Sequence, residues 1–531
     1  MRRPQHVRRW TGGVAATAAA VLVASNLSSA PVYAGPAVDS SRFRSEVTTA
    51  GITEHLQAFA AIGAANDNTR ASGTPGYNES VDYVVDRLAA AGYTPRVQPF
   101  DFPFFRENSP STLAQTAPTP TTYANPGDFA SMTYSASGTV TDKPVVAVDT
   151  TATPVSVGPD DSTSGCEASD FPATVTGAVA LMQRGTCPFG TKVANAQAAG
   201  AVAAIIFNRG SAGSEGAIAG TLGAPQAAPG IPALGASFAL GQDLFDAATR
   251  VSITSDTESE IRETYNVTAQ TEGGNARRVV HAGAHLDSVV PGPGINDNGS
   301  GSAALLEVAE AMADEAPVNK VRFSWWGAEE LNLLGSTHYV ANLSAKQLAN
   351  TALYLNFDMV GSPNYVRFVY DGDNSKFPVG PGAAAGPPGS GEIEATFHDY
   401  FESQGLASAE TPFSGRSDYG PFIAKGIPAG GLFTGAEGVK TEQEAAVFGG
   451  QAGVAYDRCY HQACDGFGNV NLQGMGEMTG AIAHAVWAFS QDASSVTGAS
   501  AGTTTARGTT GIAPRRQAHD YDAPNHHAAP R

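Results

Sequence analysis

The chain has 531 residues, four cysteines and a formal net charge of −19 at pH 7. So large an excess of acidic residues argues against nucleic-acid binding through a basic surface. The length exceeds what one compact core usually accommodates, so we expect more than one domain.

The N-terminal segment has the three parts of a secretory signal peptide. Four arginines between Arg2 and Arg9 precede an apolar, alanine-rich run over residues 14–24, and small residues near Ala34 offer a cleavage site. The apolar run is shorter than the roughly 20 residues that span a bilayer. We therefore predict a signal peptide over residues 1–34 and a mature protein that is secreted, extracellular and not held by a membrane.

Residues 52–102 are predicted to form two helices followed by a strand. Apolar residues recur at helical spacing over residues 81–88, and Gly92 supplies a C-cap for that helix. The strand that follows contains Pro95 and Pro99, which cannot donate a backbone hydrogen bond, so we expect it at the edge of a sheet.

The composition changes over residues 109–261. Glycine, proline, alanine, serine and threonine dominate, and short apolar runs are separated by turn residues. This composition, with its short apolar runs, predicts a separate, mostly β insert. The insert divides a second domain, whose two parts are residues 35–108 and 262–490. In the remaining segment, residues 491–531, apolar residues do not recur at a regular spacing, so we expect a disordered tail there.

Strands and helices alternate after Tyr265. The expected strands cover residues 279–284, 321–326 and 354–359, and the expected helices cover residues 302–314, 333–343 and 475–489. Such alternation predicts an α/β fold with a mostly parallel, mixed sheet sandwiched by helices.

Side chains that can bind metal ions recur at the ends of the predicted strands and in the loops after them. They are His285, Asp287, Asp297, Glu329, Glu330, Asp358 and His461. Each of these residue patterns also occurs commonly without a metal. Paired glutamates usually face solvent, and an aspartate after a strand is often an N-cap. In an open parallel sheet, however, ligands gather at the carboxyl ends of the strands. Imidazoles and carboxylates together suit Zn²⁺, and ligands in excess of one tetrahedral shell favour two ions.

The four cysteines lie in two separate regions of the chain. In a protein expected to be exported they suggest two disulfides. Three pairings are possible, and local pairing of Cys166 with Cys187 and of Cys459 with Cys464 is the economical interpretation.

Six short motifs together resemble those of one known family. The motifs are Gly283–Ser288, Gly292–Gly301, Trp325–Leu331, Asn356–Gly361, Gly415–Asp418 and Cys459–Asp465. They are similar to those of the secreted di-zinc aminopeptidases of the aminopeptidase S and aminopeptidase Y (leucyl aminopeptidase) family, and the likeness extends over residues 52–105 and 261–489. It implies a zinc-peptidase (phosphorylase/hydrolase-like) fold and hydrolysis of the N-terminal peptide bond of peptides, with a preference for large hydrophobic residues such as leucine.

The resemblance implies a role for each ligand at two zinc ions. His285 and Asp358 would hold one ion, and Glu330 and His461 would hold the other. Asp297 would bridge both, and the peptide bond after Asp297 is expected to be cis.

The same resemblance assigns the remaining site residues. Glu329 would be the general base acting with a zinc-bridging hydroxide, and Tyr460 would hydrogen-bond the oxyanion. Arg416 would help to hold the free amine of the substrate, and Phe433 would line its side-chain pocket. Asp287 would orient the first histidine ligand, as ligand imidazoles usually require.

Three motifs in the insert resemble a protease-associated (PA) domain. They are Gly165–Glu167, Gln183–Phe189 and Lys192–Ala196. None of their residues is expected to be catalytic. Two roles of the insert stay open: an effect on substrate access and an effect on partner contact.

Three other interpretations stay open. A carboxypeptidase or amidohydrolase on the same metal core would need a basic pocket, for which Arg416 is the candidate. A non-catalytic binding protein on a peptidase fold would have lost the base or a ligand. A mononuclear zinc site at His281 and His285 would need a helix, whereas the residues around Gly283 favour a strand.

We expect a monomer that binds two Zn²⁺ ions and acts on peptide or protein N-termini. A structural Ca²⁺ ion stays open, since acidic residues are scattered and no EF-hand loop occurs. His338, His398 and His484 are interpreted as packing or surface residues.

Overall fold

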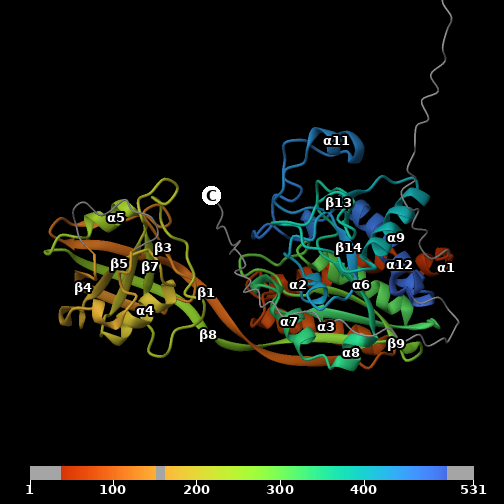
Figure 1. Cartoon of the computed structure of the whole chain (residues 1–531), viewed down its shortest axis with the longest axis horizontal. Helices are drawn as coiled ribbons and strands as arrows, with labels where there is room; N and C mark the ends of the chain where they lie inside the picture. The colour runs from red at the N-terminus through yellow and green to blue at the C-terminus, as the bar shows by residue number, and fades with distance from the viewer. Residues whose placement is uncertain (1–37, 151–161, 499–531) are drawn as a thin grey trace, which may run out of the picture.

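Two long antiparallel strands join the two lobes of the molecule (Figure 1). β1 (Arg96–Ala117) leaves the larger lobe, and β8 (Arg250–Gln270) returns to it, paired with β1 along nearly its whole length. The computed structural model describes residues 38–150 and 162–498. The signal peptide expected over residues 1–34 lies outside the described residues.

The larger lobe is built from both ends of the described chain. Its other strands are β9 (Asn275–His285), β10 (Asn319–Trp326), β11 (Thr351–Phe357), β12 (Phe368–Tyr370), β13 (Ala409–Thr411) and β14 (Ala429–Phe433). Its α-helices are α1 (Ser41–Glu46), α2 (Thr49–Ala65), α3 (Pro75–Ala90), α6 (Gly299–Met312), α7 (Leu334–Ala341), α8 (Ala345–Asn350), α9 (Ser390–Ser403), α10 (Tyr419–Ile423), α11 (Glu442–Phe448), α12 (Leu472–Gln491) and α13 (Ser494–Thr497). Two 3₁₀ turns, η3 (Glu329–Leu331) and η4 (Phe467–Asn469), complete it.

The central strands of the larger lobe are parallel. The order across the sheet is β13–β12–β14–β11–β9–β10–β8, with β1 paired to β8. β14, β11, β9 and β10 run parallel, whereas the pairs β12–β14, β10–β8 and β1–β8 are antiparallel. This is the mixed α/β sheet that the alternation of strands and helices predicts. In this lobe β1, which contains Pro99 and Pro103, is an edge strand, as its prolines indicate.

Helices cover both faces of this sheet (Figure 1). α1, α2, α3, α6, α9 and α12 pack on one face, where Trp325 and Leu353 are buried with them. α7, α8 and α10 pack on the other face, over Trp326 and Tyr354. Successive residues of a strand point to opposite faces, so strands that are apolar at every position need a layer of helices on each side.

The smaller lobe has its own sheet and its own cores. Its elements are β2 (Thr121–Thr122), β3 (Phe129–Ser131), β4 (Gly138–Ala147), η1 (Ala168–Asp170), η2 (Ala173–Val175), β5 (Val179–Gln183), α4 (Phe189–Ala198), β6 (Ala203–Phe207), β7 (Ala233–Ala236) and α5 (Phe238–Asp243). β4, β5, β6 and β7 are parallel neighbours, and β3 closes the edge antiparallel to β7. The short apolar runs expected as strands therefore form the centre of this lobe.

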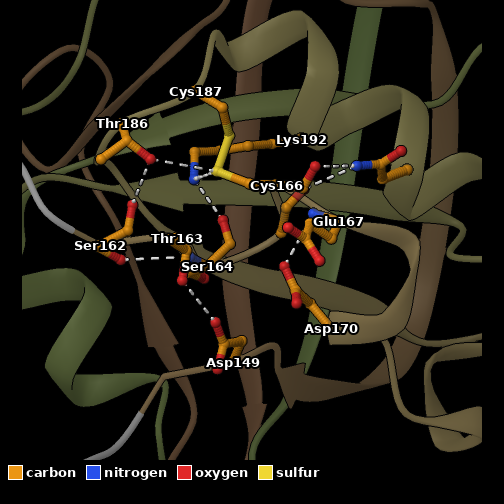
Figure 2. Close-up of a disulfide and its surroundings, with 12 residues drawn as sticks. Asp149, Ser162, Thr163, Ser164, Cys166, Glu167, Asp170, Thr186, Cys187 and Lys192 are labelled. Atoms are coloured by element: carbon orange, nitrogen blue, oxygen red, sulfur yellow. Dashed lines mark hydrogen bonds between the residues drawn. A yellow bond between two sulfur atoms is a disulfide. The ribbon is translucent and has the colours of Figure 1, made fainter.

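A disulfide joins Cys166 to Cys187 and fastens two loops of the smaller lobe (Figure 2). One loop precedes η1 and the other precedes α4. Lys192 of α4 is buried beside the bridge, donates to the carbonyl oxygen of Ser164 and lies 3.6 Å from Cys166 Sγ. The local pairing expected for these cysteines is confirmed.

The ribbon of β1 and β8 changes register between the lobes. An irregularity follows Glu107 in β1, opposite Asp256 in β8. Residue 109, where the insert is predicted to begin, lies at this irregularity, and residue 261, where it is predicted to end, lies opposite Pro103. β8 runs through residue 261 as one continuous strand.

The described chain is helical at its end. α12 ends at Gln491, the first residue of the segment expected to be a disordered tail, and α13 lies within that segment with Val496 buried. The rest of residues 491–531 lies outside the described residues. No helix within the described ranges is both long enough and apolar enough to cross a membrane.

The two lobes should unfold as separate units, because their hydrophobic cores share no side chains. Ile205→Ala in β6 should destabilise the smaller lobe by about 2–5 kcal/mol, through lost burial and the cavity left behind. Leu353→Ala in β11 should destabilise the larger lobe by a similar amount. Calorimetry should show two transitions, with each substitution lowering one. A single transition lowered by both substitutions would contradict independent cores.

Candidate metal centre

The predicted ligands gather where the parallel strands end. β9, β10 and β11 lie side by side in register, with Trp326 opposite His285 and Asn356 opposite Gly283. The loops after these strands therefore leave the sheet at one edge. A loop from β14 toward α12 returns to the same edge and carries His461.

One group of candidate ligands contains His285, Asp297 and Asp358, all of them buried. Nε2 of His285 lies 3.3 Å from Oδ1 of Asp297 and 3.3 Å from Oδ1 of Asp358. Three donor groups converge here on one small volume, which is what a metal ion requires.

The second group contains Asp297, Glu330 and His461. Nε2 of His461 lies 3.2 Å from Oδ2 of Asp297 and 3.0 Å from Oε2 of Glu330. The two carboxylate oxygens of Asp297 therefore face different histidines. This arrangement suits a carboxylate shared by two neighbouring ions.

The donor set of both groups fits zinc. Each group combines an imidazole nitrogen with carboxylate oxygens, unlike the all-oxygen shells that Ca²⁺ and Mg²⁺ prefer. Oε1 of Glu330 is buried and has no hydrogen-bond partner among the described residues, so its lone pairs are available to a ligand.

Without a bound cation, the clustered carboxylates raise the pKa values of neighbouring groups in the site. Burial by itself lowers the pKa of His461, but Glu330 and Asp297 together raise it to about 11. Burial raises the pKa of the Glu330 carboxyl to about 7, and the charge of Asp297 adds to that shift. A bound divalent cation would take the place of these protons.

Asp297 is held from several sides. The peptide bond between Asp297 and Asn298 is cis, as the resemblance implies. Asp465 accepts hydrogen bonds from the backbone N–H groups of Asn296 and Asp297 at 2.9 and 3.0 Å. The side chain of Asn298 donates to the carbonyl oxygen of Phe357, at the end of β11, at 2.9 Å. These contacts fix Asp297 relative to the neighbouring strand and loop.

Glu329 and Glu330 point to different parts of the site. Oε2 of Glu329 lies 3.8 Å from Nε2 of His285, whereas Glu330 contacts His461. Burial, reinforced by Asp358, raises the pKa of the Glu329 carboxyl well above its ordinary value. A carboxylate with a raised pKa beside a metal site is suited to accept a proton near neutral pH.

Asp287 contacts His285 through its backbone. Nδ1 of His285 lies 3.1 Å from the carbonyl oxygen of Asp287 and 3.6 Å from its carboxylate. The carboxylate accepts the backbone N–H of Glu329 at 3.1 Å. The residue expected to orient His285 thus also holds the start of the segment that carries Glu329.

Tyr460 and Arg416 lie at the open side of the site. The Arg416 guanidinium donates to the Tyr460 hydroxyl at 2.9 Å and to Glu437 at 2.7 Å. The Tyr460 ring stacks on His461 with centroids 3.8 Å apart. Burial and the charge of Asp297 raise the pKa of Tyr460 well above its ordinary value, so its hydroxyl stays protonated and able to donate.

The disulfide between Cys459 and Cys464 closes the loop that carries Tyr460 and His461. The pairing expected for these two cysteines is confirmed. All four cysteines are bridged, and none is free.

A cavity of about 250 Å³ opens beside the two ligand groups. Its apolar and aromatic lining consists of Met359, Tyr370, Pro412, Tyr419, Phe433, Ala436, Tyr456 and Tyr460. Phe433, at the end of β14, is among these lining residues. All the lining residues lie between Asp297 and His461, so the smaller lobe supplies none of them.

Two residues that support the ligands had no role assigned from the sequence. Ser417 donates to Oδ2 of Asp358 at 2.5 Å, and Asp465 holds the backbone before the bridging aspartate. Both lie inside motifs of the resemblance, next to Arg416 and Cys464. That adjacency was the only sequence signal, because these hydrogen bonds exist only in the folded chain.

His281, His338, His398 and His484 have packing roles. His281 is buried among aromatic rings on β9, and its Nε2 lies 2.7 Å from Ser324 Oγ. His281 and His285 lie on one strand, which places them about 13 Å apart and excludes a shared mononuclear site. The others contact the following partners: His338 with Phe100, His398 with Ser408, and His484 with Ser40.

Two family profiles match this chain. Peptidase family M28 matches residues 266–486, and the PA domain matches residues 141–244. An aminopeptidase of Pseudomonas aeruginosa is 48% identical over 422 residues, which are 79% of this chain and 77% of that protein. A probable leucine aminopeptidase 2 of Aspergillus oryzae is 47% identical over 338 residues, 62% of this chain and 66% of that protein.

Solved structures share the fold. The aminopeptidase from Aneurinibacillus sp. strain AM-1 superposes with a TM-score of 0.58 at 24% identity, covering 85% of this chain and 95% of that one. BSAP, a zinc aminopeptidase from Bacillus subtilis, superposes with a TM-score of 0.53 at 22% identity, covering 83% and 95%.

Zinc binding at this centre should strengthen as the pH rises. In the metal-free chain His461 keeps its proton up to a pKa of about 11 and Glu330 up to about 7. Zinc must displace these protons, so its apparent affinity should rise at least about tenfold per pH unit between pH 5 and 7. Competition with a chelating dye at fixed pH measures this, and an affinity independent of pH would contradict the assignment of the ligands.

Proposed function

This chain belongs to peptidase family M28 and is an aminopeptidase, and we propose that it uses two zinc ions to release large hydrophobic residues from peptide N-termini outside the cell. The observation that carries the proposal is the pair of ligand groups that share Asp297, with Glu329 beside them. A cavity with apolar walls adjoins both groups.

The two ligand groups would each hold one zinc ion. His285 and Asp358 would hold one ion, Glu330 and His461 would hold the other, and Asp297 would contribute to both, since it belongs to both ligand groups. When bound, such a pair of ions supplies an acidified water and polarises the scissile carbonyl group.

Glu329 would move the protons of the reaction. Its carboxylate lies beside His285 without joining a ligand group, so it can take a proton from the attacking water and deliver it to the leaving amine. The Tyr460 hydroxyl, held by Arg416, would donate to the carbonyl oxygen as negative charge develops there.

The charge of the cavity favours a free amino terminus. Glu329 and Asp358 line it and can balance an ammonium group. Arg416 is the only lysine or arginine among the described lining residues, and Glu437 already pairs with it. We therefore assign Arg416 to holding Tyr460 rather than to the amine itself. The same pairing disfavours a carboxypeptidase, which would need a free cation for the substrate carboxylate.

The side-chain preference would follow from the apolar lining. Met359, Tyr370 and Phe433 offer hydrophobic surface next to the ligand groups. Burying a leucine or phenylalanine side chain there is worth about 1.5–3 kcal/mol relative to leaving it in water. Large hydrophobic N-terminal residues would thus bind best.

Secretion is proposed from the N-terminal sequence and the disulfides. The segment over residues 1–34 has the pattern of a signal peptide. Both disulfides suit an oxidising compartment, because cytosolic thiols are kept reduced.

A pair of leucine-initiated peptides, one free and one N-acetylated, tests this function. We expect leucine release from the free peptide only, loss of activity on chelation and recovery with added Zn²⁺. Metal analysis of the same sample should give two zinc ions per chain. Cleavage of the acetylated peptide, or release from the C-terminus, would overturn the proposal.

The two adjacent glutamates should respond differently to substitution. Glu329→Gln should keep both zinc ions yet lower kcat by about 10²–10⁴-fold, because the proton acceptor is lost while the ligand set is intact. Glu330→Gln should lose one zinc ion, measured by elemental analysis after dialysis. Equal zinc loss in both variants would refute this division of roles.

A further inference from the structure

One buried side chain closes the base of the segment that carries Glu329 and Glu330. This segment, residues 327–335, is called the glutamate loop below; it follows β10 and ends in the first turn of α7. Asn266 of β8 is fully buried. Its Oδ1 accepts the backbone N–H of Gly327 at 3.1 Å, and its Nδ2 donates to the carbonyl oxygen of Gly335 at 2.9 Å. Both ends of the loop thus meet on one amide group.

The two glycines allow this close approach. A Cβ atom on Gly335 would collide with the backbone of Gly327 and with Oδ1 of Asn266. A Cβ atom on Gly327 would collide with the hydroxyl of Tyr77. The two ends of the loop therefore pack directly against each other and against the Asn266 side chain.

The conformation of the glutamate loop is not one its own sequence favours. Ala328, Asn332 and Leu333 have φ values of 52°, 69° and 60°, in the left-handed region that side chains disfavour. Such a conformation persists only where surrounding contacts enforce it. One contact is the Ser72 hydroxyl, which accepts the backbone N–H of Ala328 at 2.8 Å. Another is the backbone hydrogen bond from the Leu334 N–H to the Ala328 carbonyl oxygen at 3.0 Å, which joins the two ends of the loop. The Asn266 amide adds a buried side-chain link between Gly327 and Gly335.

We propose that Asn266 is a positioning residue of this enzyme: its amide holds the glutamate loop in the conformation that places Glu329 and Glu330 at the metal centre. The inference rests on the proposed function. Gln98, opposite Asn266 across the ribbon, accepts from Nδ2 at 3.1 Å. With Nδ2 committed to Gln98 and Gly335, Oδ1 must face Gly327, so the amide has one orientation.

Loss of this amide should disturb both glutamates. A displacement of about 1 Å at a catalytic group can lower the rate about 10²-fold. Partners behind a metal ligand typically change metal affinity by about 10–100-fold when removed. Because Asn266 touches neither the cavity nor a ligand side chain, it would act only through the backbone of the loop.

The test is Asn266→Asp, whose ionised side chain keeps the size and the acceptor for Gly327 but cannot donate to Gly335. We expect kcat to fall about 10–100-fold with KM changed by less than about 3-fold, because the apolar cavity is untouched. Zinc affinity, measured by chelator competition without substrate, should fall about tenfold or more for one of the two ions.

Asn319→Asp is the matched control. Asn319 is a buried asparagine at the opposite end of β10, and its Nδ2 donates to the carbonyl oxygen of Phe489 at 2.8 Å. It should lose thermal stability but keep wild-type kcat and zinc affinity. If Asn266→Asp behaved in the same way, the proposal would be overturned.

Two further arms keep the outcome decisive. If Asn266→Asp fails to fold, Gln98→Leu is the alternative variant, because it removes only the Gln98 oxygen that accepts from Asn266 Nδ2. This variant should lower kcat and zinc affinity by a smaller factor than Asn266→Asp. Unchanged values would overturn the proposal. Should the wild-type protein lack aminopeptidase activity, the proposed function fails, whereas the zinc measurement, which needs no substrate, still decides whether Asn266 positions the loop.

Discussion

The carboxylate of Asp297 is the group on which the site depends. Its two oxygens face His285 and His461, which reach the centre from different loops. Glu330 and Asp358 complete the two groups, so several carboxylates are buried together. Burying like charges is unfavourable until a cation compensates them. The fold must therefore hold this arrangement in place against its own repulsion.

The sheet supplies that rigidity. β9, β10 and β11 are buried on both faces between two helical layers, and their register aligns the points where their chains leave the sheet. Hydrogen bonds then fix each loop: Asp465 holds the backbone at Asp297, and Ser417 holds Asp358. The smaller lobe adds nothing to the cavity lining, yet β8, which returns from it, carries the buried Asn266 to the base of the glutamate loop.

Patterns in the sequence were most informative where burial is most complete. The strands expected over residues 279–284 and 321–326 lie within β9 and β10, because a strand buried on both faces is a continuous apolar run. The insert boundary expected at residue 261 stays a prediction, since β8 crosses it without a change of structure. The contacts of Ser417 and Asp465 could not be foreseen either, because they join residues far apart in the chain.

The sequence alone indicated the metal chemistry, through histidines and carboxylates at strand ends. It also indicated two local cysteine pairs and an insert of different composition. Residue type alone left Glu329 and Glu330 equivalent, and a family resemblance was needed to separate them. Tertiary structure supplies the physical reason for their difference. After the left-handed Ala328 the chain enters a 3₁₀ turn, in which successive side chains point about 120° apart, so one glutamate faces His461 and its neighbour does not.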